Sequence, residues 1–364
     1  MPLVAHNQLP TFQRLRRYGI EVLDLDEALH QDIRELNIGL LNMMPDAALT
    51  ATEYQFINLV GNCNKIAQFF VYPFSLPELN RGAEAEQHIA HHYFDFDELR
   101  EKGLDALIIT GANVANPRLE EEAFWSPLIE VVEWADEHVA SVLCSCLATH
   151  ALLQHHHGIR RRLMPEKKWG VYRHRVRAPD HPLVRDINTR FDAPHSRWND
   201  VSRQQIEAQG LRVLAESEEA GVHLAVSRDG FRKVYFQGHP EYEAHSLLKE
   251  YKREVNRFLD GELDAPPPYP QHYFEPRAIS TAQNFIEESR QARRSAEPVS
   301  EFPEQALHSL VDNTWGDTGK AIVNNWLGLV YRLSNNDPHG QFRPGVDPDD
   351  PLASGGKGSE TRGG

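Results

Sequence analysis

Short apolar runs alternate with amphipathic segments through the N-terminal part of the chain, and this alternation constrains the fold more than any other feature. The runs with the character of buried strands lie at 36–42, 65–72, 104–110 and 140–143. Segments with apolar residues at helical spacing lie between or after them, at 50–60, 124–138 and 147–157. Strands that are apolar throughout and are separated by helices are typical of parallel sheets covered on both faces. We therefore predict an α/β fold with a mostly parallel sheet flanked by helices.

The alternating pattern belongs to a first part of the chain at 1–263. Two further strands, 223–227 and 233–236, are separated by an Arg-Asp-Gly turn signal and predict a hairpin. An amphipathic helix follows at 247–259 and ends at an Asp-Gly pair. We expect this first part to be the catalytic domain.

The composition changes after residue 263. Residues 264–337 begin with a Pro-rich connector at 265–270 and contain an amphipathic helix at 318–333, which we expect to dock back on the domain. In 338–364, 11 of 27 residues are Gly or Pro, so we predict a disordered tail there. The three predicted parts are thus 1–263, 264–337 and 338–364.

The overall charge and the cysteine content exclude several classes of protein. With 38 Lys+Arg and 53 Asp+Glu the formal charge is −15, which argues against a protein that binds nucleic-acid backbone. No run approaches the ~18 apolar residues of a membrane span, and the N-terminus does not resemble a secretory signal. Three cysteines form no disulfide framework. We expect a soluble, cytoplasmic enzyme that binds neither nucleic acid nor membrane.

Cys146 stands where an apolar strand meets a helix, which is the position of a nucleophile elbow. The tight turn needs small residues two positions before and after the nucleophile, and Cys144 and Ala148 are small. Around Cys144 the corresponding neighbour is the β-branched Val142, so Cys146 is the better candidate. The helix N-terminus would favour a thiolate and hold an oxyanion on backbone N–H groups. On this segment alone, two structural core cysteines are an equally good interpretation.

His239 and Glu241 follow a predicted strand, within Gly238-His239-Pro240-Glu241. Residues two apart in an extended chain face the same way, so the carboxylate can orient the imidazole. Such an imidazole can act as the base for a thiol. In a chain that also offers an elbow cysteine, this pair favours a Cys146–His239–Glu241 catalytic triad over a structural role.

The chain resembles the homoserine O-acyltransferases of the glutamine-amidotransferase-like class, best known as homoserine O-succinyltransferases. The resemblance covers roughly 8–275, with a weaker match at 315–333. The matching motifs occur in the family's order: LLNMMP (40–45), LIITGA (107–112), the Cys146 elbow, EKKWGVY (166–172), APHSRW (193–198) and GHPEY (238–242).

This resemblance implies a class I glutamine amidotransferase-like (flavodoxin-like) fold with a C-terminal helical extension. It also implies an acyl-enzyme on Cys146, with His239 as proton acceptor and Glu241 as its partner. The expected reaction is ping-pong transfer of a succinyl group from succinyl-CoA to the hydroxyl of L-homoserine, in methionine biosynthesis. We expect no cofactor beyond this acyl-CoA co-substrate, and a homodimer.

Three further residues match the family's substrate-binding positions. Lys167 in EKKWGVY matches a substrate-binding lysine, and Ser196 in APHSRW matches a substrate-contacting serine. Arg253, on the helix after GHPEY, matches the arginine expected to hold the amino acid's carboxylate.

The acyl donor depends on Ala115. At this position the family uses glycine with succinyl-CoA and glutamate with acetyl-CoA. A small uncharged residue leaves room for the longer chain, so Ala115 favours succinyl-CoA. The sequence departs from the family after Met44-Pro45, where Asp46-Ala47 stand in place of lysine, so the role of that lysine is missing or is supplied by another residue.

Other interpretations compete with this one. The donor can be acetyl-CoA or the acceptor serine, the same triad can act as a glutaminase, or the chain can be a catalytically silent binding module. We expect no metal site, because the adjacent histidines at 155–157 point to different sides of a helix and cannot chelate together.

Overall fold

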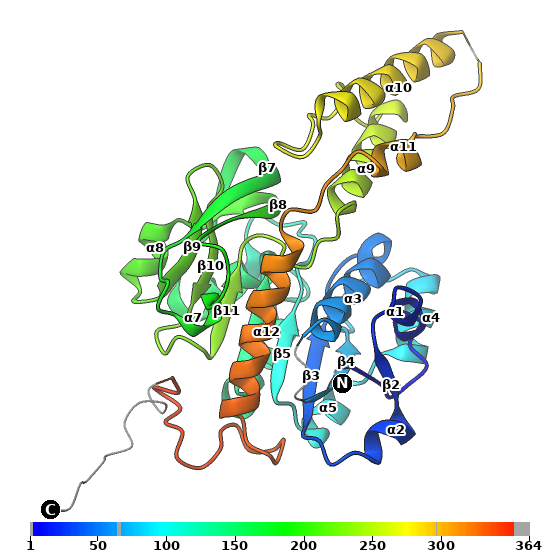
Figure 1. Ribbon diagram of the computed structural model, residues 1–364. Coiled ribbons are helices and arrows are strands. Elements are labelled where there is room, and N and C mark those ends of the chain that lie inside the picture. Colours follow the sequence, from blue (N-terminus) through cyan, green and yellow to red (C-terminus); the bar gives the residue numbers. More distant parts are fainter. Residues whose placement is uncertain (1–2, 64–66, 296, 353–364) are drawn as a thin grey trace, which may run out of the picture.

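The computed structural model describes residues 3–63, 67–295 and 297–352. Its strands form one sheet (Figure 1). In chain order they are β1 (Leu3–Ala5), β2 (Val22–Asp24), β3 (Glu35–Leu41), β4 (Gln68–Phe74), β5 (Ala106–Ile109), β6 (Ser141–Ser145), β7 (Arg162–Val176), β8 (Arg190–Asp200), β9 (Arg212–Ser217), β10 (Gly221–Val226) and β11 (Lys233–Phe236). The order across the sheet is β2-β1-β4-β3-β5-β6-β11-β10-β9-β7-β8.

The half of the sheet from β2 to β11 is parallel, and the half from β11 to β8 is antiparallel. The predicted strands at 36–42, 104–110 and 140–143 are confirmed as β3, β5 and β6. The predicted strand at 65–72 is β4, which is described from Gln68 onward, since 64–66 lie outside the described residues. The prediction of a mostly parallel sheet in an α/β fold is confirmed.

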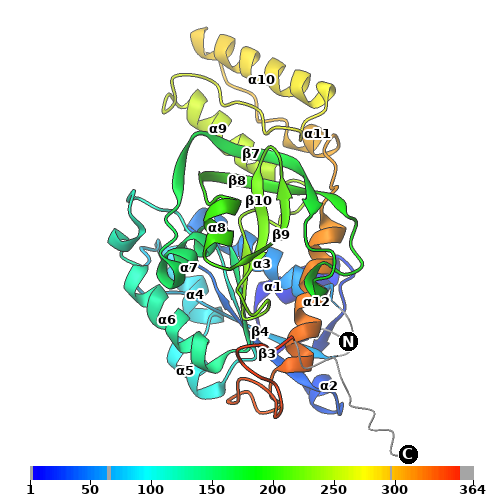
Figure 2. The ribbon, with the colours of Figure 1, turned by 90° about the vertical axis from the view of Figure 1, so that its left-hand side faces the viewer.

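Helices cover both faces of the sheet, so the molecule has three layers. In chain order they are α1 (Pro10–Arg17), α2 (Leu25–Leu29), α3 (Asp46–Gly61), α4 (Ala83–His92), α5 (Phe96–Lys102), α6 (Trp125–His138), α7 (Leu147–His157), α8 (Arg203–Ala208), α9 (Ser246–Leu259), α10 (Pro276–Arg294), α11 (Glu304–His308) and α12 (Gly316–Leu333). Buried side chains of α1, α3 and α12 form one core with the sheet, and those of α5, α6 and α7 form the other. Figure 2 shows α12 and α6 on opposite sides.

The long antiparallel pair of β7 and β8 is not among the strands predicted from the sequence. Both strands are rich in charged residues and lack a continuous apolar run, so hydrophobic patterning did not reveal them. Their ladder runs from Arg162 opposite Asp200 to Arg175 opposite Arg190. This pair carries the EKKWGVY and APHSRW motifs and brings them side by side at Trp169 and Ser196.

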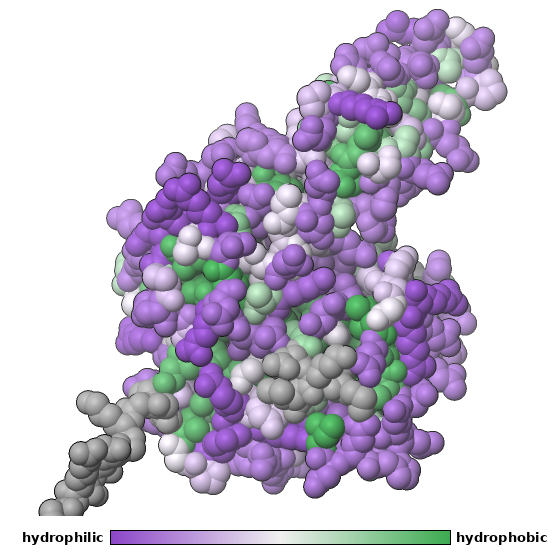
Figure 3. Space-filling model, in the orientation of Figure 1, coloured by the Kyte–Doolittle hydropathy of each residue, from purple (hydrophilic) through white to green (hydrophobic). Residues whose placement is uncertain are grey.

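A helical extension formed by α9, α10 and α11 projects from the body (Figure 1). These helices share a third core with Trp169 and Val171 of β7. The extension meets the sheet where Val171 N donates to Gln271 O at 2.9 Å. Gly170 has a φ of +151°, and a Cβ there would lie 2.1 Å from Gln271 O, so this contact requires glycine. The face in Figure 3 is mostly hydrophilic, with apolar patches on the extension.

The predicted helix at 318–333 is confirmed as α12, which packs on the body as expected. Trp326 is fully buried, and its Nε1 donates to Ser141 Oγ of β6 at 2.8 Å. Arg34, beside β3, donates to Ser334 Oγ at 2.8 Å just after the helix ends. Among the described residues, no helix combines the length and apolar character needed to cross a membrane.

The prediction of disorder from residue 338 onward is wrong for 338–352. Gln341 Nε2 donates to the carbonyls of Asp136 and Val139 at 2.9 Å each, and the side chain of Leu352 packs on the core. In 338–352, the high content of Gly and Pro corresponds to turns in a segment that follows the surface of the body. The rest of the predicted tail, 353–364, lies outside the described residues.

Candidate active site

The predicted catalytic residues gather at the carboxyl ends of parallel strands. Cys146 follows β6 directly, and His239 lies three residues after the end of the neighbouring β11. The loops after β3 and β5 contribute Met44 and Gly111 to the same edge. In α/β sheets, ligand sites are built in this position, because loops from several strands converge there.

Cys146 has the backbone conformation of a nucleophile elbow. Its φ of 52° and ψ of −107° lie in a region that non-glycine residues rarely adopt, and it caps α7. Its N–H donates to Phe236 O of β11 at 2.8 Å. Thr149 Oγ1 donates to Phe236 O at 2.8 Å and to Cys144 O at 3.1 Å, which holds the first turn of the helix on the sheet.

The elbow exposes one of its two cysteines. Cys144 is fully buried, and burial raises the pKa of its thiol, whereas Cys146 is only partly buried and lines a cavity. Leu147, whose N–H is the first of α7, and Gly111 line the cavity with it. N–H groups in the first turn of a helix lack acceptors within the helix, so this end can hold an oxyanion.

His239 and Glu241 form the expected pair beside this cysteine. His239 Nδ1 bonds to Glu241 Oε1 at 2.7 Å, and both side chains are buried. Burial alone lowers the pKa of His239, but the charges of Glu241 and Cys146 outweigh it and hold this pKa well above its usual value. His239 Nε2 is buried and makes no hydrogen bond of ordinary geometry to a described residue, although its interaction with the side chain of Cys146 also raises the pKa of His239. The imidazole is therefore held in place with one nitrogen left for proton transfer.

A carboxylate that the sequence analysis missed, Glu250 on α9, ties the predicted binding residues together. Lys167 Nζ lies 3.2 Å from Glu250 Oε2, and Ser196 Oγ donates to the same oxygen at 2.6 Å. Tyr242 Oη donates to Glu250 Oε1 at 2.6 Å, and its ring stacks on His239 with centroids 4.2 Å apart. Burial alone raises the pKa of Glu250, but Lys167 and these hydrogen bonds outweigh it and lower the pKa.

The other two predicted binding positions are less enclosed. Arg253 lines the cavity, yet its side chain is 58% exposed and pairs with Glu254 at 3.0 Å. Glu250 stands three residues before Arg253, on the same side of α9, and this spacing was the signal that would have revealed it. Ala115 does not line the cavity in this structure, although its neighbours Asn113 and Val114 do.

The cavity has a volume of about 350 Å³. Cys146, His239 and the predicted binding residues line it together with residues from the loop after β5 and from β8, whereas Glu241 does not line it. Its lining consists of Met44, Gly111, Ala112, Asn113, Val114, Cys146, Leu147, His150, Arg161, Lys167, Ser196, Arg197, Trp198, Asn199, His239, Tyr242, Glu250 and Arg253.

Asp46 stands where the family has a lysine, and its side chain binds a neighbouring loop. Asp46 accepts a hydrogen bond from Gly82 N at 2.7 Å and pairs with Arg81 at 3.2 Å. Arg81 also donates to Met44 O, so it supports the loop that lines the cavity from behind. Neither Asp46 nor Arg81 lines the cavity itself.

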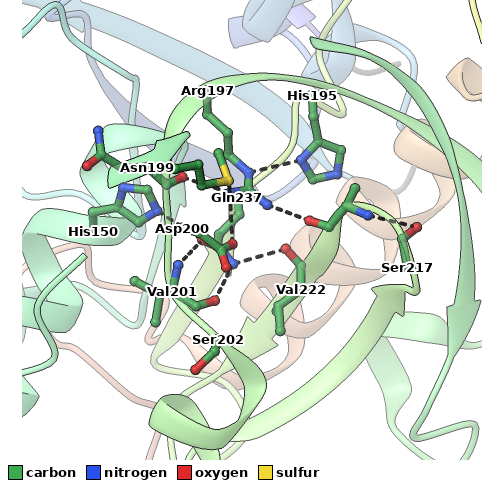
Figure 4. Close-up of polar contacts among 12 residues, drawn as sticks. His150, His195, Arg197, Asn199, Asp200, Val201, Ser202, Ser217, Val222 and Gln237 are labelled. Carbon is green, nitrogen blue, oxygen red and sulfur yellow. Dashed lines mark hydrogen bonds and ion pairs between the residues drawn. The ribbon is translucent and has the colours of Figure 1, made fainter. Parts of the chain in front are cut away.

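Gln237, two residues before His239 in the chain, lies in a buried hydrogen-bond network (Figure 4). Its Oε1 accepts hydrogen bonds from His150 Nε2 and Val201 N, both at 2.9 Å. Its Nε2 donates to Val201 O at 2.9 Å and to Val222 O at 3.0 Å. All hydrogen-bonding groups of this buried amide are satisfied, so the end of β11 is fixed relative to α7, β8 and β10.

Three buried histidines, His174, His195 and His223, form a group among the described residues whose ring nitrogens lie within 4.8 Å of one another, close enough to share a metal ion. Hydrogen bonds occupy ring nitrogens of His174 and His195, whereas the buried Nδ1 of His223 has no hydrogen-bond partner among the described residues. His174 Nδ1 donates to Tyr172 O at 2.8 Å, and Arg197 Nε donates to His195 Nδ1 at 3.3 Å. His195 Nε2 can therefore donate to His174 Nε2 at 3.1 Å.

The electrostatics of this histidine cluster favour neutral rings in a hydrogen-bonded chain. Burial lowers the pKa of His174 to about 4 and the pKa of His195 well below its usual value. The charge of Arg197 beside His195 opposes a second cation at the same place. The sequence pattern does not predict this cluster, because its members come from three different strands.

Comparisons with known proteins agree with the resemblance in the motifs. A family model described as homoserine O-succinyltransferase matches residues 2–336. Proteins named homoserine O-succinyltransferase from Thioalkalivibrio nitratireducens and Thiobacillus denitrificans are each 58% identical over 352 residues, and one from Methylococcus capsulatus is 56% identical. These alignments cover 97% of this chain and 99% of each relative.

Solved structures align over most of the chain at low identity. A glutamine amidotransferase from Thermotoga maritima covers 81% of this chain and 97% of its own, with 12% identity and a TM-score of 0.42. A glutamine amidotransferase from Methylobacillus flagellatus covers 82% of this chain and 95% of its own, with 13% identity and a TM-score of 0.43. The match of the family model and the identity to these relatives extend over nearly the whole length. The chain belongs to the homoserine O-succinyltransferase family.

Proposed function

We propose that this protein transfers the succinyl group of succinyl-CoA to the hydroxyl of L-homoserine through an acyl-enzyme on Cys146. The observation that carries the proposal is the buried His239–Glu241 pair, with its 2.7 Å hydrogen bond, next to a cysteine on a nucleophile elbow. No cofactor is needed, because thioester and acyl-cysteine have similar energies. The product, O-succinyl-L-homoserine, carries a leaving group for sulfur incorporation in methionine biosynthesis. Acyl-CoA is a cytoplasmic metabolite, so we place the reaction there.

In the first half-reaction, the Cys146 thiolate attacks the thioester carbonyl of succinyl-CoA. The resulting oxyanion faces the N–H of Leu147 at the start of α7. When the tetrahedral intermediate collapses, the bond between the carbonyl carbon and the CoA sulfur breaks. The leaving thiolate takes the proton of the His239 imidazolium, and CoA departs as the thiol.

In the second half-reaction, His239 acts as a base. Acylation removes the charge of Cys146, one of the charges that hold the pKa of His239 up against the effect of burial. The neutral imidazole takes the hydroxyl proton of homoserine on Nε2 while the hydroxyl oxygen attacks the acyl carbon. The bond to Cys146 Sγ then breaks, which restores the thiolate and the imidazolium.

The residues around Glu250 suit the charged ends of homoserine. The Glu250 carboxylate can accept a further hydrogen bond on Oε1, which the substrate ammonium supplies. Lys167 and Arg253 both line the cavity and are positioned for the substrate carboxylate. Ser196 and Tyr242 hold Glu250 in place through their 2.6 Å hydrogen bonds.

The proposal is tested by CoA thiol release from succinyl-CoA and from acetyl-CoA, each with and without L-homoserine. We expect homoserine-dependent release that is faster with succinyl-CoA, and L-serine should not replace L-homoserine at equal concentration. Preference for acetyl-CoA would contradict the assigned donor. Release of ammonia from glutamine, or no release of CoA from either donor, would contradict the reaction itself.

A further inference from the structure

Arg161, which the sequence analysis did not single out, lines the same cavity as Cys146. It lies between the end of α7 and the start of β7. Its Nη2 donates to Asn116 O at 3.5 Å, so its guanidinium lies beside the loop that follows β5. The side chain therefore lines the cavity of the nucleophile and also contacts the loop that contains Ala115.

Arg161 differs in its ion pairing from the other positively charged side chains of the cavity. The others each have a carboxylate close by: Lys167 with Glu250 at 3.2 Å, Arg197 with Asp200 at 2.8 Å and Arg253 with Glu254 at 3.0 Å. Within the described part of the chain, no carboxylate lies within ion-pair distance of Arg161. Its Nε is buried and has no hydrogen-bond partner among these residues. A partly buried guanidinium of this kind retains donors for an anion.

The loop beside Arg161 is held in place by the carboxylate of Glu122, which accepts hydrogen bonds from the loop backbone. Glu122 Oε1 accepts hydrogen bonds from Ala115 N at 2.7 Å and from Asn116 N at 2.6 Å. Glu122 thus holds the backbone N–H groups of the loop, while Arg161 contacts its carbonyl side at Asn116. Glu122 thus positions the loop against the cavity without forming an ion pair with Arg161, although its charge raises the pKa of Arg161.

Arg161 is close enough to Cys146 for their charges to interact. The pKa of Arg161 is lowered, because burial outweighs the charges of Glu122 and Cys146, which raise it. In the proposed mechanism, acylation removes the thiolate of Cys146 and with it one negative charge that would face Arg161. A carboxylate at the far end of the acyl group would restore a negative charge in the same cavity.

We propose that Arg161 binds the terminal carboxylate of the succinyl group, both in the acyl-CoA and on the acylated Cys146, and so selects a dicarboxylic acyl donor. The inference rests on the proposed function and deepens it. It assigns the donor's charged end to Arg161 and the acceptor's charged ends to the residues around Glu250. The small side chain at Ala115 then acts by leaving this path open, rather than by contacting the donor.

The test compares succinyl-CoA with succinamoyl-CoA, in which an uncharged amide of the same shape replaces the terminal carboxylate. The rate of homoserine-dependent CoA release is measured as kcat/KM for both donors with the unchanged protein and with Arg161→Gln. We expect the unchanged protein to prefer succinyl-CoA by roughly 10- to 100-fold, the range for a charge-assisted hydrogen bond. Arg161→Gln should abolish most of this preference while retaining activity with the amide. Arg160→Gln, a change of the neighbouring and largely exposed arginine, should leave the preference unchanged.

The outcomes separate this inference from the proposed function. If the unchanged protein transfers no succinyl group to homoserine, the proposed function itself fails. If it does so but uses the amide equally well, Arg161 does not recognise the carboxylate. An equal loss with both donors in Arg161→Gln also contradicts the inference, because it would assign Arg161 to the nucleophile alone. The comparison of donors on the unchanged protein decides the question even if Arg161→Gln does not fold.

Discussion

At the scale of single residues, the site depends on one backbone angle and one buried charge pair. A φ of 52° at Cys146 costs on the order of 1–3 kcal/mol, which the surrounding hydrogen bonds from Thr149 must offset. The strained turn places the thiol at the helix N-terminus and beside the imidazole of His239. Burial lowers the pKa of His239, and Glu241, buried two residues away, supplies a charge that helps to raise this pKa well above its usual value.

Glu241→Gln should shift the basic limb of the pH profile of kcat/KM to lower pH. The Glu241 charge raises the pKa of His239 against the effect of burial, so the imidazolium persists up to this raised pKa and is lost as the pH rises through it. Without the charge the pKa falls, and the active ion pair is lost at lower pH. Steady-state rates across the pH range measure the shift.

Glu243→Gln is the matched control for this variant. Glu243 is also a carboxylate near the turn, but it pairs with Arg14 at 3.8 Å and does not line the cavity. Its pH profile should coincide with that of the unchanged protein. An unshifted basic limb in Glu241→Gln would mean that this carboxylate does not set the protonation of His239.

Sequence reasoning identified Cys146, His239 and Glu241 because local chain geometry defines them: a strand end, a small-residue turn and an i, i+2 pair. It missed Glu250 and Arg161, since their importance lies in contacts with residues far away in the sequence. Glu250 meets Lys167 and Ser196 only because β7, β8 and α9 converge. The family resemblance supplied Lys167 and Ser196, and the structure adds the carboxylate that joins them.

At the scale of elements, patterning predicted the parallel strands and missed the antiparallel pair of β7 and β8. Buried parallel strands are apolar on both faces and stand out in the sequence. The first part of β7 is instead exposed or half-buried and rich in charged residues, and the strand is partly covered by the extension, so its pairing was not visible locally. The contact between Gly170 of β7 and Gln271 joins the site to the extension that carries Glu250.

Gly170→Ala should lower the free energy of unfolding by about 1–3 kcal/mol and reduce activity. The new Cβ would lie 2.1 Å from Gln271 O, and alanine does not favour a φ of +151°. Urea denaturation followed by circular dichroism measures the change.

Gly328 is the control position, because a side chain added there meets no neighbouring atom. Gly328 lies within α12 and an added Cβ would meet no atom within 4 Å, so Gly328→Ala should raise the free energy of unfolding by about 0.5–1 kcal/mol. If both variants had the same stability, the close approach at Gly170 would not be a constraint on the fold.

At the scale of the whole molecule, three layers and a projecting extension are connected by α12 and the segment after it. This part returns to the body through Trp326, through Arg34 at Ser334 and through Gln341. The amphipathic pattern of 318–333 predicted the docking helix. The sequence did not predict that 338–352 follows the surface of the body. The acceptors for Gln341 are backbone carbonyls, and every residue has a carbonyl, so no sequence pattern indicates them.

Trp326→Ala should lower the free energy of unfolding by about 3–5 kcal/mol, the range for truncating a buried aromatic residue. The change removes a fully buried side chain and its hydrogen bond to Ser141. Trp198→Ala, at a side chain that is 54% exposed, should change stability by no more than about 0.5 kcal/mol. Denaturant unfolding followed by far-ultraviolet circular dichroism compares the two, and similar losses would mean that α12 does not stabilise the body.

The central claim is that Cys146 becomes covalently acylated. The most direct measurement is the intact mass of the protein mixed with succinyl-CoA in the absence of homoserine, followed by addition of L-homoserine. We expect one succinyl adduct, located on Cys146 by peptide mapping, that disappears when homoserine is added and does not form in Cys146→Ala. Cys144→Ala, which changes the fully buried neighbour, should still form it. An adduct that persists in Cys146→Ala, or one that homoserine does not discharge, would contradict the account.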